Sequence, residues 1–163
     1  MSEKQAFLEA WEREAVTTMK VLRAYPPDKM DLRPHPSCRT AKELAWAFVF
    51  DGIGGSQATQ GELKFPPPNL PPMPDTWQGM TGEAERALRI LAEEVRKVGE
   101  PQLNTTIKFF TGPKQMGDVR RLDFLWFLLN DTIHHRGQFS IYLRMAGGKV
   151  PAIYGPSGDE KWT

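Results

Sequence analysis

The sequence contains little cysteine: Cys38 is the only one among 163 residues. An internal disulfide is therefore excluded, and this usage is typical of proteins in a reducing compartment. Long apolar runs are also lacking, since the longest candidate, DFLWFLLND, is far shorter than the roughly 20 residues that span a bilayer. The charged start MSEKQ differs from the apolar signal peptides that direct secretion. These absences predict a cytoplasmic protein that does not enter a membrane.

No charge of one sign is in excess, because 21 lysine and arginine residues stand against 20 aspartates and glutamates. Nucleic acids and anionic membrane surfaces are bound by proteins that gather a basic excess on one face. The charge balance therefore predicts no nucleic acid and no membrane partner. Hydrophobic residues make up 40% of the chain, as in globular proteins, and the length predicts a single domain over residues 1–163.

Apolar residues at helical spacing predict four long helices. Their expected ranges are 2–24, 41–53, 81–98 and 118–146, with Gly54 ending the second and Asp118 capping the last. The stretch GELKFPPPNLPPMP, residues 61–74, has too many prolines for a helix and predicts an extended crossover. The stretch LNTTIKFFTG has strand character, but an isolated strand would have nothing to pair with, so a loop is expected there.

These elements predict an all-α fold, a four-helix bundle with a proline-rich crossover. The C-terminal stretch VPAIYGPSGDEKWT is irregular, yet its apolar side chains predict that it packs on the helices. These side chains are Val150, Ile153, Tyr154 and Trp162. Arg136 is expected to help fix this tail by pairing with Asp159 or Glu160.

Two of the three histidines, His134 and His135, are neighbours in LLNDTIHHRGQ, within the last predicted helix. Successive residues on a helix point about 100° apart, so only one of them can face the interior. Asp131 lies one turn before His135 on a largely apolar face. A carboxylate and an imidazole at this spacing suit a divalent metal held between helices. The same spacing also suits a buried, hydrogen-bonded polar pair without a metal. Spacing alone favours the polar pair, but both interpretations stay open.

The stretch IHHRGQFSIYLRMAGGKVPAIYGPSGDE resembles the C-terminal signature of the DinB-like (DinB/YfiT) superfamily, in particular the branch with H-H-R-G-Q, Y-L-R and V-P-x-x-Y-G-P. A second stretch, LRPHPSCRTAKELAW, resembles the loop and second-helix start of that family. The resemblance implies a four-helix bundle, commonly a homodimer, with a site between helices that binds zinc or nickel through three histidines in many members. Relatives include thiol-cofactor-dependent transferases and an isomerase.

Carried over residue by residue, the family's last histidine ligand falls on His135, which is present. The ligand four residues earlier falls on Asp131, and the first, after E-L-A-x in the second helix, falls on Ala47, which cannot bind a metal. Asp51 lies one turn beyond Ala47, so Asp51, Asp131 and His135 are the candidate metal ligands. Two carboxylates and one imidazole form a harder ligand set than three imidazoles, which shifts preference from zinc or nickel towards manganese or iron. The other interpretation is that Asp51 only precedes the helix end.

Two functions follow from this degenerate metal site. The first is a metal-dependent hydrolase, or a thiol-cofactor-dependent transferase, that acts on a small molecule. No motif places a histidine near Cys38, so a low-molecular-weight thiol is expected to supply any thiolate. The alternative is a non-catalytic, dimeric bundle that binds small molecules or serves a stress response. Ala47 favours the alternative, whereas His135 beside Asp131 supports the enzyme, and no catalytic residue is assigned.

Overall fold

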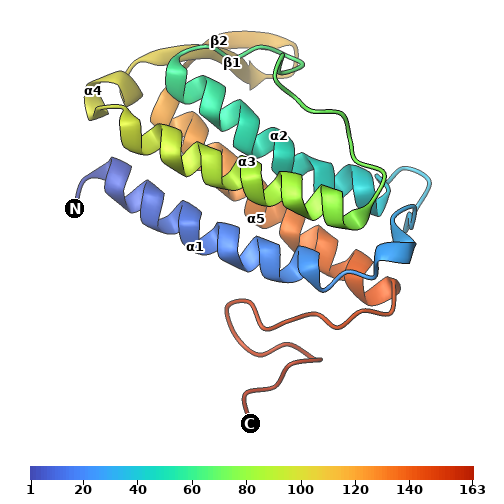
Figure 1. The fold of residues 1–163 in the computed structure, drawn as a ribbon. Helices are drawn as coiled ribbons and strands as arrows, with labels where there is room; N and C mark the ends of the chain where they lie inside the picture. Colours follow the sequence, from blue (N-terminus) through green and yellow to red (C-terminus); the bar gives the residue numbers. More distant parts are fainter.

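Four long helices lie side by side in the structure, a computed structural model that describes residues 1–163 (Figure 1). They are α1 (Glu3–Arg23), α2 (Ala41–Gln60), α3 (Trp77–Lys97) and α5 (Arg121–Met145). Helices α1 and α2 each pack against both α3 and α5. Following the chain colours in Figure 1, α1 and α5 run in one direction and α2 and α3 in the other. Because α2 and α3 are parallel, the proline-rich segment between them returns along the length of the helices.

Shorter elements complete the mostly helical fold. A 3-10 helix, η1 (Pro27–Lys29), follows α1, and the single-turn helix α4 (Glu100–Leu103) follows α3. Buried side chains of all four long helices join one hydrophobic cluster of 33 residues. None of the helices combines the length and the apolar character of a membrane span.

A capping box fixes the start of α2, the helix that carries Asp51. The Thr40 hydroxyl accepts a hydrogen bond from the Glu43 N–H at 3.3 Å, and the Glu43 carboxylate accepts one from the Thr40 N–H at 2.7 Å. These two bonds satisfy amide groups that the first turn of a helix would otherwise leave unpaired. The register of α2, and with it the direction of Asp51, is thereby set from its first turn.

The predicted end of this helix near Gly54 is wrong, because α2 continues to Gln60 and ends at Gly61, whose φ is 91°. The earlier glycines serve helix packing. A Cβ atom added at Gly52 would lie 2.4 Å from the backbone carbonyl carbon of Ala87 on α3. Asp51 therefore lies inside a helix, and the interpretation that it merely precedes a helix end is also wrong.

Replacing Gly52 with alanine is expected to lower the free energy of unfolding by about 2 kcal/mol, because the added methyl group forces the α2 and α3 backbones apart. Gly54→Ala is the matched control, since no atom lies within 4 Å of a Cβ added there. Alanine also favours a helix over glycine by about 1 kcal/mol. Urea denaturation measures both variants, and equal stabilities would contradict the close approach of α2 and α3.

The all-α prediction is wrong in one respect, because a β-hairpin joins α4 to α5. Strand β1 (Thr106–Gly112) pairs antiparallel with β2 (Gln115–Arg120), and Ile107 stands opposite Val119. The expected loop thus contains a strand, and its partner is the next segment of the chain. Asp118 lies in β2, where it pairs with Lys108 at 2.9 Å, so it is not the N-cap of the last helix. That helix begins at Arg121.

The C-terminal tail, residues 147–163, has no helix or strand and packs against the helices through its first part. Val150 and Ala152 are buried, but Tyr154 and Trp162 remain 66% and 65% exposed, contrary to expectation. The expected pairing of Arg136 is also wrong. Salt bridges that hold the tail come from other cations instead: Arg144 binds Asp159 at 2.7 Å and Lys20 binds Glu160 at 3.2 Å.

Arg136 is instead buried between α1 and α5, where it pairs with Glu14 at 2.7 Å. Tyr154 of the tail completes the group, since its hydroxyl donates to the Glu14 carboxylate at 2.6 Å and accepts from the Arg136 guanidinium. Burial alone would raise the pKa of Glu14, but the hydrogen bonds from Tyr154 and Arg136 outweigh it and the pKa is lowered. The tail is thus attached to a charge pair in the core.

Tyr154→Phe is expected to lower the free energy of unfolding by about 1 kcal/mol, because one hydrogen bond to a charged carboxylate is lost while Arg136 stays paired. A carboxyl group whose pKa is lowered by folding stabilises the protein above its ordinary pKa of 4.5 and loses that contribution as pH falls below it. The difference in the free energy of unfolding between variant and wild type should therefore become smaller at acidic pH. Denaturation curves at pH 7 and pH 4 test this, and a difference that grows in acid would contradict it.

Candidate metal centre

The structure brings Asp51, Asp131 and His135 together between α2 and α5. One potential ligand atom from each lies within 4.8 Å of the other two. Asp131 and His135 occupy successive turns of α5, and Asp51 faces them from α2, which packs against α5. The three candidates thus form one group, although they are 84 residues apart along the chain from Asp51 to His135.

His135 carries a buried nitrogen without a hydrogen-bond partner. Its Nδ1 lies 3.3 Å from Asp131 Oδ2, which is within ion-pair distance. The geometry of the contact is nevertheless not that of a hydrogen bond, and no other group binds this nitrogen. Buried polar atoms are normally satisfied, so an unpaired one requires an explanation. The two side chains thus lie at ion-pair distance, and the polar-pair interpretation stays open beside the metal-site interpretation.

The two carboxyl groups have opposite electrostatic properties. Asp51 is only 5% exposed and accepts one side-chain hydrogen bond, from the Thr132 hydroxyl at 2.8 Å. Burial, assisted by the negative charge of Asp131, raises the pKa of Asp51 to about 7. The neighbouring His135 imidazole lowers the pKa of Asp131. Below about pH 7 the group thus holds one ionised carboxylate and one that is mostly protonated unless a cation replaces the proton.

The donor set fits a divalent cation. Two carboxylate oxygens and one imidazole nitrogen converge from two helices, and His135 Nδ1 has no hydrogen-bond partner. A cation there would neutralise the two carboxylates and bind the imidazole. Ala47 lines the same hollow but contributes no ligand atom. The set therefore matches manganese or iron better than a site of three histidines would.

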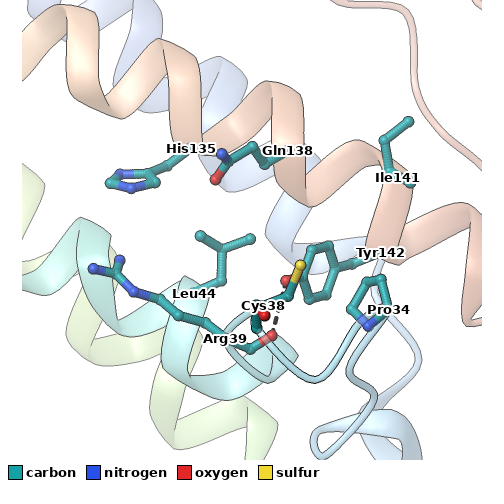
Figure 2. Close-up of a pocket in the computed structure, with 9 residues that line it drawn as sticks. Pro34, Cys38, Arg39, Leu44, His135, Gln138, Ile141 and Tyr142 are labelled. Atoms are coloured by element: carbon teal, nitrogen blue, oxygen red, sulfur yellow. Dashed lines mark hydrogen bonds between the residues drawn. The ribbon is translucent and has the colours of Figure 1, made fainter.

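A hollow of about 730 Å³ opens over this group and makes it accessible to a small molecule. Besides the three candidates, its lining includes Cys38 and Arg39 from the segment before α2. A neighbouring hollow of about 470 Å³ shares Cys38, Arg39 and His135 and is drawn in Figure 2. There the Arg39 side chain extends along α2 towards the His135 ring, on the opposite side of the hollow from α5.

Other polar residues near the histidines have partners that define their roles. The Gln138 amide contacts His134 Nε2 at 2.9 Å, so His134 belongs to an exposed pair outside the candidate centre. The Tyr142 hydroxyl donates to the Arg39 carbonyl oxygen at 2.8 Å, which holds the segment before α2 against α5. Cys38 lies in the lining of both hollows together with His135, a proximity that no sequence motif indicated.

Sequence reasoning missed two features near Asp51 and Asp131: Arg39 and a group of phenylalanines. Phe124 and Phe127, at helical spacing on α5, and the adjacent Phe109 and Phe110 were a signal for an aromatic cluster. Their meeting depends on the hairpin, which was not predicted. Arg39 belongs to the irregular segment before α2, and no periodic pattern indicates the direction of its side chain.

Comparison with known proteins identifies the family of this chain. Residues 81–162 match the profile of the DinB family. The uncharacterised protein YrdA of Bacillus subtilis (strain 168) is 28% identical over 156 residues, which cover 94% of this chain and 89% of YrdA. These comparisons concern the family as a whole and do not identify the narrower H-H-R-G-Q branch.

Two solved structures share the fold. A DinB-like protein from Bacillus cereus ATCC 10987 superposes with a TM-score of 0.73 at 24% identity, over 92% of this chain and 97% of the other. The DinB-like protein YjoA of Bacillus subtilis gives a TM-score of 0.71 at 17% identity, over 87% of this chain and 92% of the other. At these identities the likeness concerns the fold, and the chemistry must be argued from the residues of this chain.

Proposed function

The chain belongs to the DinB family, and from this premise we propose that it is a divalent-metal-dependent enzyme acting on a small molecule, with Asp51, Asp131 and His135 as the metal ligands. In this proposal the four long helices form a four-helix bundle of the DinB/YfiT type. The observation that supports it most is the convergence of three donor atoms within 4.8 Å around a buried histidine nitrogen that has no hydrogen-bond partner. His135 Nδ1 lies 3.3 Å from Asp131 Oδ2 without the geometry of a hydrogen bond, so a cation could bind it together with the carboxylates.

Each residue of the proposed metal site has its own role. Asp51 and Asp131 supply negative charge from two helices, and Thr132 orients Asp51 through its hydrogen bond. His135 supplies the nitrogen donor, and its side chain is only 14% exposed. A divalent cation at this position supplies Lewis-acid chemistry, which stabilises negative charge developing on an oxygen or sulfur atom. The hollow beside it holds the small molecule in place.

Two reaction classes fit this chemistry: hydrolysis, and transfer to a low-molecular-weight thiol. They differ in whether a thiolate binds at the cation. Absorption spectra of the Co²⁺-loaded protein, recorded with and without 2-mercaptoethanol, separate them. A sulfur-to-cobalt charge-transfer band that is absent from the Asp131→Ala variant would support the transferase, and no new band would support the hydrolase. Failure of the wild-type protein to retain Co²⁺ would contradict both.

A second candidate function is favoured by one residue, Ala47. Where the family resemblance places the first histidine ligand, this chain has a side chain with no donor atom. This supports a non-catalytic bundle that binds small molecules or serves a stress response. Under that alternative, metal-treated and chelator-treated protein should bind small molecules equally well. The enzyme proposal expects binding or turnover that depends on the metal.

The proposal also retains the homodimer that the family resemblance implies and the cytoplasmic location that the composition predicts. Light scattering of the purified protein during size-exclusion chromatography measures the mass in solution. A mass of about twice 18.5 kDa supports the dimer, and the mass of one chain contradicts it.

A further inference from the structure

A largely apolar cavity of about 250 Å³ adjoins the candidate metal centre on the side of the hairpin. Six of the nine phenylalanines in the chain line it. They are Phe50, Phe65, Phe109, Phe110, Phe124 and Phe127. Phe109 is central among them, with its ring 4.6 Å from that of Phe124 and 5.5 Å from that of Phe127, measured between centroids. We call these six residues the phenylalanine cluster.

The cluster exposes more apolar surface than anchoring the hairpin requires. Phe124 is buried and Phe109 is half-buried, and these two are sufficient to attach β1 to α5. Phe65, Phe110 and Phe127, however, remain 58%, 55% and 48% exposed around the same cavity. They come from the crossover, the hairpin and α5. Apolar side chains that gather from three segments and stay open to solvent indicate a binding surface for an apolar group.

Arg39 is an exposed residue that lines the hollow over the metal centre but not the cavity of the phenylalanine cluster, and it has no partner. Among the eleven arginines of the chain, it is the one whose guanidinium forms neither a salt bridge nor a hydrogen bond. Arg33 lines the same hollow but is paired with Glu43 at 3.4 Å. Figure 2 shows the Arg39 guanidinium directed to the His135 end of the hollow. An unpaired guanidinium that faces a cavity is suited to hold a carboxylate or phosphate group.

The two hollows meet at the metal centre, because Phe50, Asp51, Phe65 and Asp131 line both. A molecule that occupies both therefore passes over the carboxylates. Resting on the proposed function, we infer that the substrate is an amphipathic anion: an aromatic or branched apolar group lies on the phenylalanine cluster, an anionic group lies on Arg39, and the bond that reacts lies between them.

The inference is tested by titration calorimetry with three probes: 3-phenylpropanoate, propanoate, which lacks the ring, and 3-phenylpropan-1-ol, which lacks the charge. 3-Phenylpropanoate should bind at least about tenfold more tightly than either of the other two. In Phe127→Ala, affinity for both ring-containing probes should fall about tenfold, because a half-exposed ring is removed from the cluster with little effect on the core. In Arg39→Gln, affinity for the two carboxylate probes, 3-phenylpropanoate and propanoate, should fall, and affinity for 3-phenylpropan-1-ol should not.

Two control variants sharpen the result. Arg86→Gln removes an arginine that is paired with Glu83 on α3, outside the two hollows, and should leave binding nearly unchanged. Val16→Ala removes a 73% exposed apolar side chain from α1, away from the cavity, and should have no effect. Equal affinities for the three probes, or an equal loss in Arg86→Gln and Arg39→Gln, would overturn the inference.

Repeating the probe titrations with and without Mn²⁺ tests this inference separately from the proposed function. If the protein retains no metal but prefers 3-phenylpropanoate as described, the proposed function fails and the assignment of the two binding surfaces stands. If it retains metal but shows no preference among the probes, the proposed function stands and the substrate assignment fails.

Discussion

Replacing His135 with alanine is expected to lower the affinity for Mn²⁺ about a hundredfold or more, because the only nitrogen donor of the candidate centre is removed. Two carboxylates remain, one of them buried with its pKa raised to about 7, and they form an incomplete site. Titration calorimetry of the metal-free protein with Mn²⁺ measures the change.

His134→Ala is the matched control. The two histidines are adjacent, but His134 is exposed and contacts Gln138 rather than the carboxylates. Its replacement should leave the affinity unchanged. If both variants lose affinity equally, or neither does, His135 has no special role and the ligand set is wrong.

Asp51→Asn is expected to stabilise the metal-free protein by about 3 kcal/mol at pH 8, while strongly weakening metal binding. Folding raises the pKa of this buried carboxyl group from its ordinary 3.8 to about 7. Above pH 7 the carboxyl group is ionised in the folded and in the unfolded protein. The buried negative charge then destabilises the folded protein. Asparagine has the same shape and an oxygen that can still accept from Thr132, but it carries no charge.

The pH dependence supplies the control for this variant. Well below pH 3.8 the carboxyl group is protonated whether the protein is folded or not, so the stability difference between variant and wild type should be smallest there. Between pH 4 and 7 the unfolded state releases the proton and the folded state retains it, so wild-type stability falls relative to the variant as pH rises. Urea denaturation of chelator-treated protein across this range measures the difference. A constant difference would contradict the raised pKa.

Residues close in sequence made part of the candidate centre predictable. Asp131 and His135 are one helical turn apart, and helical geometry is sufficient to place both on one face. Asp51 was reached only through the family resemblance, which identifies Ala47 as a ligand position one turn earlier. That Asp51 meets the other two depends on the packing of α2 against α5, which spacing along one helix does not determine.

The remaining features depend on contacts between distant segments. Arg136 was expected to bind the tail because Asp159 and Glu160 lie nearby in sequence, but Glu14 competes for it from α1, 122 residues away. The hairpin escaped prediction because its second strand, QMGDVR, lacks the β-branched pattern that marks strands and contains a plausible helix cap. The glycines of α2 resembled a helix end, since their close fit against α3 is visible only in three dimensions.

The most direct test of the central claim is the metal content of the untagged protein after equilibrium dialysis against manganese, iron, nickel and zinc in turn. Elemental analysis should find close to one equivalent of at least one of these metals in the wild type. It should find almost none in Asp131→Ala, which removes one carboxylate ligand. No metal retained by the wild type under any of these conditions, or equal retention by the variant, would contradict a metal centre formed by Asp51, Asp131 and His135.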